Sequence, residues 1–366
     1  MPDDDVSEIM AKLGITPDQP DAADLRGLIE YVTELGASAD EIMTAAVLES
    51  LGPLALDFAI RTPGECVPLD VFAAAANLDP ALVDQLWLAL GLPESPPMPF
   101  PVTPDLAEAL RMLAFLTGVF GVDVVLGFAR VIGSSAERIA DALTSATRVG
   151  IEVPQRGEGM PYRDVVREYS STAQDLLPVL WDAIGAVFRR HLVLVSYEGF
   201  ELEKSQHGVT LQRAIGFIDL VGSTEILRTQ SVEELAESVN RFERLIGDRV
   251  TKSGGRVVKL IGDEAMFAFI DLRVAIETCH ELVEASPNPV RIGLAFGEVV
   301  AMHGDYFGPT VNLAARLVAN SAPSRVLVSD ETRRAAAGLF EFEAVEVGPL
   351  RGFPDVRRAH IARPLQ

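Results

Sequence analysis

Residues 304–316 read Gly-Asp-Tyr-Phe-Gly-Pro-Thr-Val-Asn-Leu-Ala-Ala-Arg, and the C-terminal half of the chain is interpreted from this stretch outward. Gly308-Pro309 predicts a helix start, because proline fits the first helical position, where its missing N–H costs nothing. Asn312 and Arg316 lie four residues apart and therefore share one face of that helix. With Asp305 in the preceding loop, three polar groups converge at a helix N-terminus, which favours anions. The alternative is a solvated Asn–Arg pair on an exposed helix.

Composition predicts two domains with different roles. The chain has 366 residues, 48% of them hydrophobic, and a formal charge of −22. Residues 1–190 hold 29 acidic and 12 basic side chains, a net −17, whereas residues 191–366 carry −5. Because a strongly acidic half is a poor electrostatic match for nucleic acid or an anionic membrane, neither is expected as a partner.

The cysteines and the apolar runs predict a cytoplasmic protein. Cys66 and Cys279 lie far apart in the sequence and lack metal-ligand spacing, which suits a reducing compartment. The N-terminus is acidic, so no signal peptide is visible. The most apolar run, residues 112–122, is too short to span a bilayer.

The N-terminal half, residues 1–190, is predicted to be an all-α domain. Asp21 is a predicted N-cap, and Ser38 to Glu41 form a capping box before an apolar stripe. Further helices are expected at 71–76, 80–90, 105–132 (one or two buried helices), 134–149 and 161–192, and connectors at 93–104 and 191–208. The pair within 71–90 resembles a helix-turn-helix, but it lacks basic residues for phosphate contacts, so a helical hairpin is favoured. Residues 105–132 are interpreted as core, with an apolar ligand between helices as the alternative.

From Gln212 the pattern changes to alternating strands and helices. Strands are expected at 214–219, 256–261, 265–270, 290–296, 299–303, 326–328, 340–345 and 356–362, and helices at 233–252, 272–285 and around Asn312. The order strand–helix–hairpin–helix–strand is that of an α+β ferredoxin-like sandwich. We therefore expect residues 209–366 to form one α+β domain.

Two carboxylates stand at predicted strand ends. Asp219 ends a strand before the small-residue loop at 220–224, and Asp263 lies at the tip of a hairpin. Mg²⁺ is typically bound by one or two carboxylates together with substrate phosphates, which loop amides and a helix N-terminus could meet. Each aspartate taken singly is equally explained as a turn or cap residue.

Together these residues resemble the class III nucleotidyl cyclases, over roughly residues 212–362, and the arrangement implied is βααββαβ. The resemblance implies that Asp219 and Asp263 bind two divalent ions, Mg²⁺ or Mn²⁺. It also implies the conversion of ATP to 3′,5′-cyclic AMP and pyrophosphate. In that reaction the ribose 3′-hydroxyl attacks the α-phosphorus, and the metals lower the hydroxyl pKa and clamp the triphosphate.

The same resemblance implies roles for four further residues. Lys259 and Asp305 would select adenine, since lysine donates to a ring nitrogen and aspartate accepts from the exocyclic amine. Asn312 and Arg316 would stabilise the transition state. Arg351 lies where a basic phosphate contact is often found in this family.

In this family each active site lies across a dimer interface, with metals on one chain and base and transition-state contacts on the other. Because this chain carries both sets, a symmetric homodimer with two sites is expected. The alternative from another class is a non-catalytic nucleotide-sensing or DNA-binding regulator with a cyclase-like domain. The intact metal and transition-state residues argue against it.

The N-terminal half resembles, by size, helicity and position, the helical regulatory domain of some soluble bacterial cyclases, which is thought to respond to pH. His191 and His207 bracket the connector, and three glutamates lie between them, at positions 198, 201 and 203. The histidine pKa of about 6.5 lies in the physiological range, and nearby carboxylates favour the charged form. We therefore expect control of the catalytic dimer by pH; the alternative is that both histidines are solvated linker residues.

Overall fold

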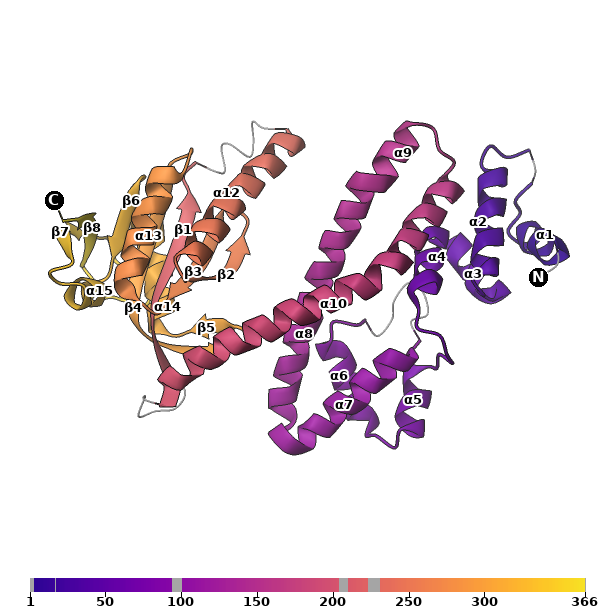
Figure 1. Cartoon of the computed structure of the whole chain (residues 1–366), viewed down its shortest axis with the longest axis horizontal. Helices are drawn as coiled ribbons and strands as arrows, with labels where there is room; N and C mark the ends of the chain where they lie inside the picture. Colours follow the sequence, from indigo (N-terminus) through magenta and orange to yellow (C-terminus); the bar gives the residue numbers. More distant parts are fainter. Residues whose placement is uncertain (1–2, 17, 94–100, 204–209, 223–230, 366) are drawn as a thin grey trace. The chain divides into compact units, whose positions relative to one another are not determined.

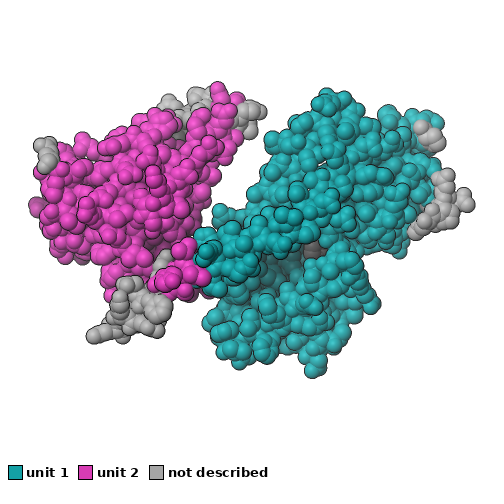
Figure 2. Space-filling view, viewed as in Figure 1, with its two compact units in different colours: residues 1–192 teal, residues 193–366 magenta. Residues whose placement is uncertain are grey.

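A computed structural model gives the fold of the chain. It describes residues 3–365 apart from 17, 94–100, 204–209 and 223–230, and the side chains of 3–5, 198–203 and 232–233 are likewise outside the described part. The chain divides into two compact units, Met1–Leu192 and Val193–Gln366 (Figure 2). Within the described residues, no helix is both long and apolar enough to cross a membrane.

The first unit is helical (Figure 1). Its helices are α1 (Asp3–Lys12), α2 (Ala22–Glu34), α3 (Ala39–Val47), α4 (Leu51–Ile60), α5 (Leu69–Ala75), α6 (Pro80–Ala89), α7 (Pro104–Phe120), α8 (Val122–Thr147), a π-helical turn (Arg148–Glu152), α9 (Val153–Gly157) and α10 (Tyr162–Glu203). The capping box of Ser38 and Glu41 is confirmed. Asp21 stands at the N-cap of α2, but its side chain makes no capping hydrogen bond, so that detail of the prediction was wrong.

Two separate cores hold the helical unit together. One joins α1–α4, and Val166 of α10 packs into it. The other joins α5–α8, with Leu86, Leu110 and Leu113 almost fully buried. Because α10 begins in the first core and continues to Glu203, it runs through the predicted connector and crosses from the first unit into the second.

The prediction for residues 105–149 needs two corrections. The second helix does not end near residue 132, because α8 continues without a break to Thr147; the break falls at Gly121, where φ is +88°. The stretch is also not wholly buried, since Phe115 is 71% and Val119 60% exposed. A helix buries only one stripe against a neighbour, so an apolar run on all sides leaves the rest exposed.

The helical unit contains a cavity of about 650 Å³, and none of the residues that line it belongs to 105–132. It is lined by residues of α2, the loop before it, the α3–α4 connection, α9 and the start of α10, both apolar (Leu25, Leu51) and acidic (Asp21, Asp24). An apolar ligand between the helices of 105–132, the alternative to a core, stays untested.

The second unit is an α+β domain (Figure 1). Its elements are β1 (Thr210–Leu220), α12 (Val232–Lys252), β2 (Arg256–Ile261), β3 (Glu264–Phe269), α13 (Leu272–Ala285), β4 (Val290–Met302), β5 (Asp305–Phe307), α14 (Pro309–Asn320), β6 (Arg325–Val328), α15 (Asp330–Ala335), β7 (Phe340–Glu346) and β8 (Arg358–Pro364). The strand order is β2-β3-β1-β4-β6-β8-β7, and β5 pairs with β4. The β2-β3-β1-β4 part is the predicted ferredoxin-like order.

Each face of the sheet is covered by its own helices. Phe242, Ile246 and Ile276 of α12 and α13 pack on one face. Leu317 and Val318 of α14 pack on the opposite face, against the β-strand residues of a second core. The polar face of α14 is therefore turned away from the sheet.

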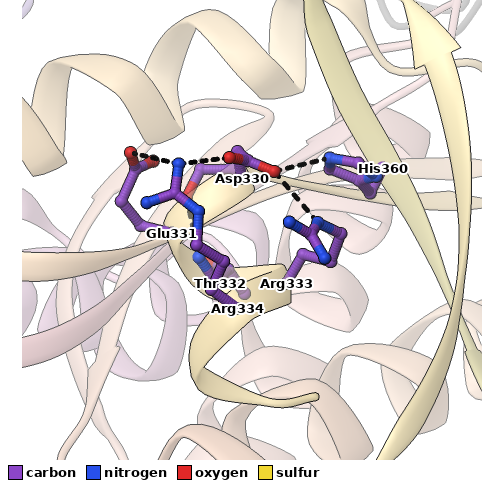
Figure 3. Close-up of polar contacts among 7 residues, drawn as sticks. Asp330, Glu331, Thr332, Arg333, Arg334 and His360 are labelled. Carbon is purple, nitrogen blue, oxygen red and sulfur yellow. Dashed lines mark hydrogen bonds and ion pairs between the residues drawn. The ribbon is translucent and has the colours of Figure 1, made fainter.

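Three details of the second unit differ from the sequence expectation. The strands expected at 290–296 and 299–303 are one strand, β4, because β1 pairs with it continuously from Val290 to Val300. Asp305 opens the short strand β5 instead of lying in a loop. The short helix α15 was not predicted. Asp330 on it bonds Arg333 and Arg334 of the same helix and His360 of β8 (Figure 3).

Candidate active site

The strand register brings Asp219 and Asp263 together. Asp219 is the penultimate residue of β1, and the backbone N–H of the next residue, Leu220, donates to the Asp263 carbonyl over 3.1 Å. Glu264 lies directly opposite Asp219 on β3. Burial raises the pKa of Asp219 above its ordinary value, and the adjacent Asp263 carboxylate raises it further. Burial also raises the pKa of Glu264, with contributions from both aspartates. Carboxylates are thus concentrated at one end of the sheet.

Arg291 partly neutralises this group of carboxylates. It lies opposite Asp219 on β4, and its Nε donates to Asp219 Oδ2 over 2.6 Å while Nη2 also contacts that oxygen. This ion pair lowers the pKa of Asp219 against the effect of burial. The sequence analysis missed Arg291 and Glu264. A sequence analysis could have found them by predicting that β3 and β4 flank β1 and then looking for charged residues opposite Asp219 on those two strands.

Lys259 and Asp305 form a second polar pair. Lys259 Nζ lies 2.5 Å from Asp305 Oδ2, although the residues are 46 positions apart in the chain. The side chains are 37% and 27% exposed, so both remain reachable from solvent. Asp305 Oδ1 accepts from the backbone N–H of Tyr306 over 2.8 Å.

Asn312 and Arg316 lie on the exposed side of α14. Pro309 occupies the first turn as predicted, and Gly308 at the N-cap has φ +132°, a value that only glycine adopts readily. Thr310 Oγ1 donates to the Glu298 carbonyl over 2.7 Å, which ties the helix start to β4. Within the described part of the chain, neither the Asn312 amide nor the Arg316 guanidinium is engaged in a hydrogen bond or ion pair.

The candidate metal ligands of the site are two aspartates, Asp219 and Asp263. Among the described residues, no group of three or more His, Cys, Asp or Glu is arranged to hold a metal ion. Two adjacent carboxylates whose mutual repulsion raises a pKa nevertheless fit a hard divalent cation, because Mg²⁺ keeps several waters and takes further oxygens from substrate phosphates. The donor set therefore fits metal that binds together with a nucleotide.

For two further predicted features, the described part of the chain shows no contact with these residues. Arg351 is exposed in the connection between β7 and β8. The loop after Asp219 is described only as far as Gly222, so the amides predicted to meet a triphosphate at 223–224 lie outside the described residues.

Comparison with known proteins gives consistent results over this domain. Residues 209–361 match the family described as Adenylate and Guanylate cyclase catalytic domain. An adenylate cyclase of Streptomyces coelicolor is 33% identical over 70% of this chain and 68% of its own length. A pH-sensitive adenylate cyclase of Mycobacterium tuberculosis is 26% identical over 99% of this chain and 92% of its own. The crystal structure of the adenylyl cyclase CyaB from P. aeruginosa aligns at 22% identity over 43% of this chain and 96% of that one, with a TM-score of 0.37.

Catalytic domains of this family act on nucleotides. The chain belongs to the class III nucleotidyl cyclases, and within them to the adenylate cyclases, which are phosphorus–oxygen lyases.

Proposed function

We propose that the chain converts ATP to 3′,5′-cyclic AMP and pyrophosphate at two equivalent sites of a homodimer. The observation that carries the choice of ATP is the Lys259–Asp305 pair. A lysine donor beside an aspartate acceptor matches the ring nitrogen and the exocyclic amine of adenine. Guanine would present a carbonyl to Asp305 and repel it. Without nucleotide the two side chains satisfy each other.

Asp219 and Asp263 are the proposed metal ligands. Their carboxylates are adjacent and partly buried, so a divalent cation would relieve the repulsion between them. The ions, when bound, would acidify the ribose 3′-hydroxyl and neutralise the triphosphate. Arg291 donates to Asp219 Oδ2 and opposes the rise in the pKa of that carboxyl that burial causes.

Asn312 and Arg316 are proposed to act on the α-phosphate. Both project from the exposed side of α14, so a nucleotide brought by a second copy of the chain can reach them. Arg316 would stabilise the negative charge that develops on the phosphoryl oxygens during in-line attack. Because each chain carries both sets of groups, a symmetric dimer contains two complete sites.

We propose further that the helical half, residues 1–190, regulates this dimer and that pH is one of its signals. The relative matched over nearly the whole chain is a pH-sensitive adenylate cyclase. Helix α10 passes from the helical unit through residues 191–203, which offers a mechanical connection. His191 is exposed on this helix, whereas His207 lies outside the described residues.

Product formation from purified full-length protein tests the proposal. With ATP and Mg²⁺ or Mn²⁺ we expect cyclic AMP, and a much lower rate with GTP. The variant Lys259→Glu with Asp305→Cys should lose ATP turnover by on the order of 100-fold, because a site built around polar contacts rejects a partner that leaves them unpaired. ATP binding without any cyclic AMP would favour the non-catalytic regulator instead.

A further inference from the structure

Three contacts join strand β2 to the hairpin formed by β4 and β5. Arg256 Nη2 donates to the Gly304 carbonyl over 2.7 Å. The Arg256 guanidinium carbon also lies 5.8 Å from the centre of the Tyr306 ring, within the range of a cation–π contact. Lys259 makes the third contact, to Asp305 itself. Arg256 therefore holds the residues immediately before and after Asp305.

A bulge in β2 lets Arg256 and Lys259 reach the same hairpin. Residues three apart on a regular strand point to opposite faces. Here the register between β2 and β3 shifts between Val257 and Lys259. As a result the partners of Arg256 and Lys259 on β3 are only two residues apart, at Ala268 and Met266. The extra residue restores the alternation, so both cationic side chains share one face of the sheet.

The hairpin turn presents the carbonyl that Arg256 binds. His303 and Gly304 have φ values of +53° and +77°, and Met302 pairs with Asp305 across the turn. Two positive φ values in a two-residue loop are typical of a type I′ turn, whose geometry is narrowly defined. Fixing Gly304 therefore also fixes the backbone from which Asp305 projects.

We propose that Arg256 is a positioning residue for base selection. It anchors the β4–β5 hairpin at the place where Asp305 and Lys259 together meet the adenine ring, and it does not touch the base itself. This inference rests on the proposed function of that pair. When a base engages Lys259 and Asp305, their mutual contact is given up, and the Arg256 contacts are the described links that remain between β2 and the hairpin.

The test compares Arg256→Gln, Arg256→Lys and a matched control, Arg273→Gln, in the full-length chain. Arg273 is an exposed arginine of α13 that pairs with Glu277 of the same helix. For Arg256→Gln we expect KM for ATP to rise about tenfold, the effect of losing a hydrogen bond from a charged donor. The value of kcat should change much less, and the preference for ATP over GTP should fall. Arg256→Lys keeps a donor and should recover part of the KM, while Arg273→Gln should match the wild type.

Hydrogen exchange of the amides at 303–307, measured without nucleotide, separates this inference from the proposed function. Faster exchange in Arg256→Gln than in Arg273→Gln supports the anchoring role even if wild-type protein makes no cyclic AMP, a result that would reject only the proposed function. Unchanged exchange overturns the inference. An active wild type whose KM and base preference survive Arg256→Gln overturns it as well.

Discussion

The two carboxylate oxygens of Asp305 have different partners. Oδ1 accepts from the Tyr306 backbone N–H at 2.8 Å, a contact set by the backbone of β5, whereas Oδ2 accepts from Lys259 at 2.5 Å. A bond to the adjacent backbone fixes the carboxylate plane without blocking the second oxygen. Only Oδ2 therefore has to change partner when an amine approaches, which makes Asp305 a preorganised acceptor.

Asp330 contributes to the stability of the second unit in a pH-dependent way. Its carboxylate bonds Arg333, Arg334 and His360, which joins α15 to β8 (Figure 3). The contacts with Arg333 and Arg334, the Arg333 bond foremost, lower the pKa of Asp330 to about 2 from an ordinary 3.8. A depressed carboxyl pKa adds stability that is present above the unfolded-state pKa and is lost as the pH falls through the folded-state value.

We expect Asp330→Asn to lower the stability of the domain at pH 7 by at most about 1 kcal/mol, since the carboxylate is partly exposed and screened. The difference from wild type should shrink as the pH falls from 4 towards 2. Glu331→Asn is the matched control. Glu331 lies on the same turn, but its carboxylate makes only a long contact, 3.9 Å, with Arg334. Denaturant titrations across this pH range measure the effect, and a gap that does not depend on pH would contradict it.

At the scale of elements, the packing of α14 on β4 depends on a glycine. A Cβ on Gly293 would lie 2.2 Å from the backbone nitrogen of Val318 and 2.6 Å from the carbonyl oxygen of Ala314. Backbone atoms cannot rotate away, so a methyl group here must push the helix off the sheet. The helix that carries Asn312 and Arg316 would move with it.

Gly293→Ala is therefore expected to destabilise the second unit by about 1–3 kcal/mol and to reduce cyclase activity strongly. Gly247→Ala in α12 is the control, because nothing lies within 4 Å of a Cβ there and helical alanine gains about 0.5–1 kcal/mol over glycine. Thermal unfolding followed by circular dichroism, with parallel assays of cyclic AMP, compares the two variants. Equal melting temperatures for both would refute the close-packing argument.

The sequence predicted the second unit well where local signals and tertiary packing agree. Gly308-Pro309 marked the start of α14, and the turn at Gly262-Asp263 placed the β2–β3 hairpin. Strand β5 could not be predicted, because three residues carry no period and form a strand only by pairing with the end of β4. Arg291 was missed for a related reason. It lies 72 residues from Asp219 in the chain, and their contact depends on the register between β1 and β4. The roles of the six predicted site residues remain predictions.

At the scale of the whole molecule, the proposed site needs two chains. Asp219→Ala and Arg316→Ala should each abolish most activity, yet a mixture should regain part of it. In a mixed dimer one site collects both defects and the other collects neither. Random exchange of equal amounts makes half of the dimers mixed, so about one quarter of all sites become intact. Mixed dimers purified through two different tags should reach about half of wild-type activity, and background activity in them would exclude a shared site.

The acidic helical half, residues 1–190, would add electrostatic repulsion to the proposed dimer. Residues 1–190 carry −17, so two copies repel each other near neutral pH when they are brought together. His191 is exposed on α10 in the segment that joins the two units, and a histidine side chain gains positive charge when it is protonated. Mild acidification should therefore reduce the repulsion and change how the catalytic halves meet. This effect requires the helical unit to be covalently present.

We therefore expect the full-length chain to gain activity, relative to a chain that begins near Gly208, as the pH falls from about 7.5 to about 5.5, a window centred on the ordinary histidine pKa of about 6.5. The shorter chain lacks both the −17 charge and α10, so its profile should report only the chemistry of the catalytic domain. Initial rates at saturating ATP and metal, measured across this range for both chains, give the ratio. His191→Ala and His207→Ala, singly and together, then locate the sensing groups. Should both histidines prove dispensable while the two profiles still differ, the titrating groups lie elsewhere in the helical unit. Identical profiles for the two chains would remove pH from the proposed regulation, because the helical half would then contribute no proton-linked term to the activity.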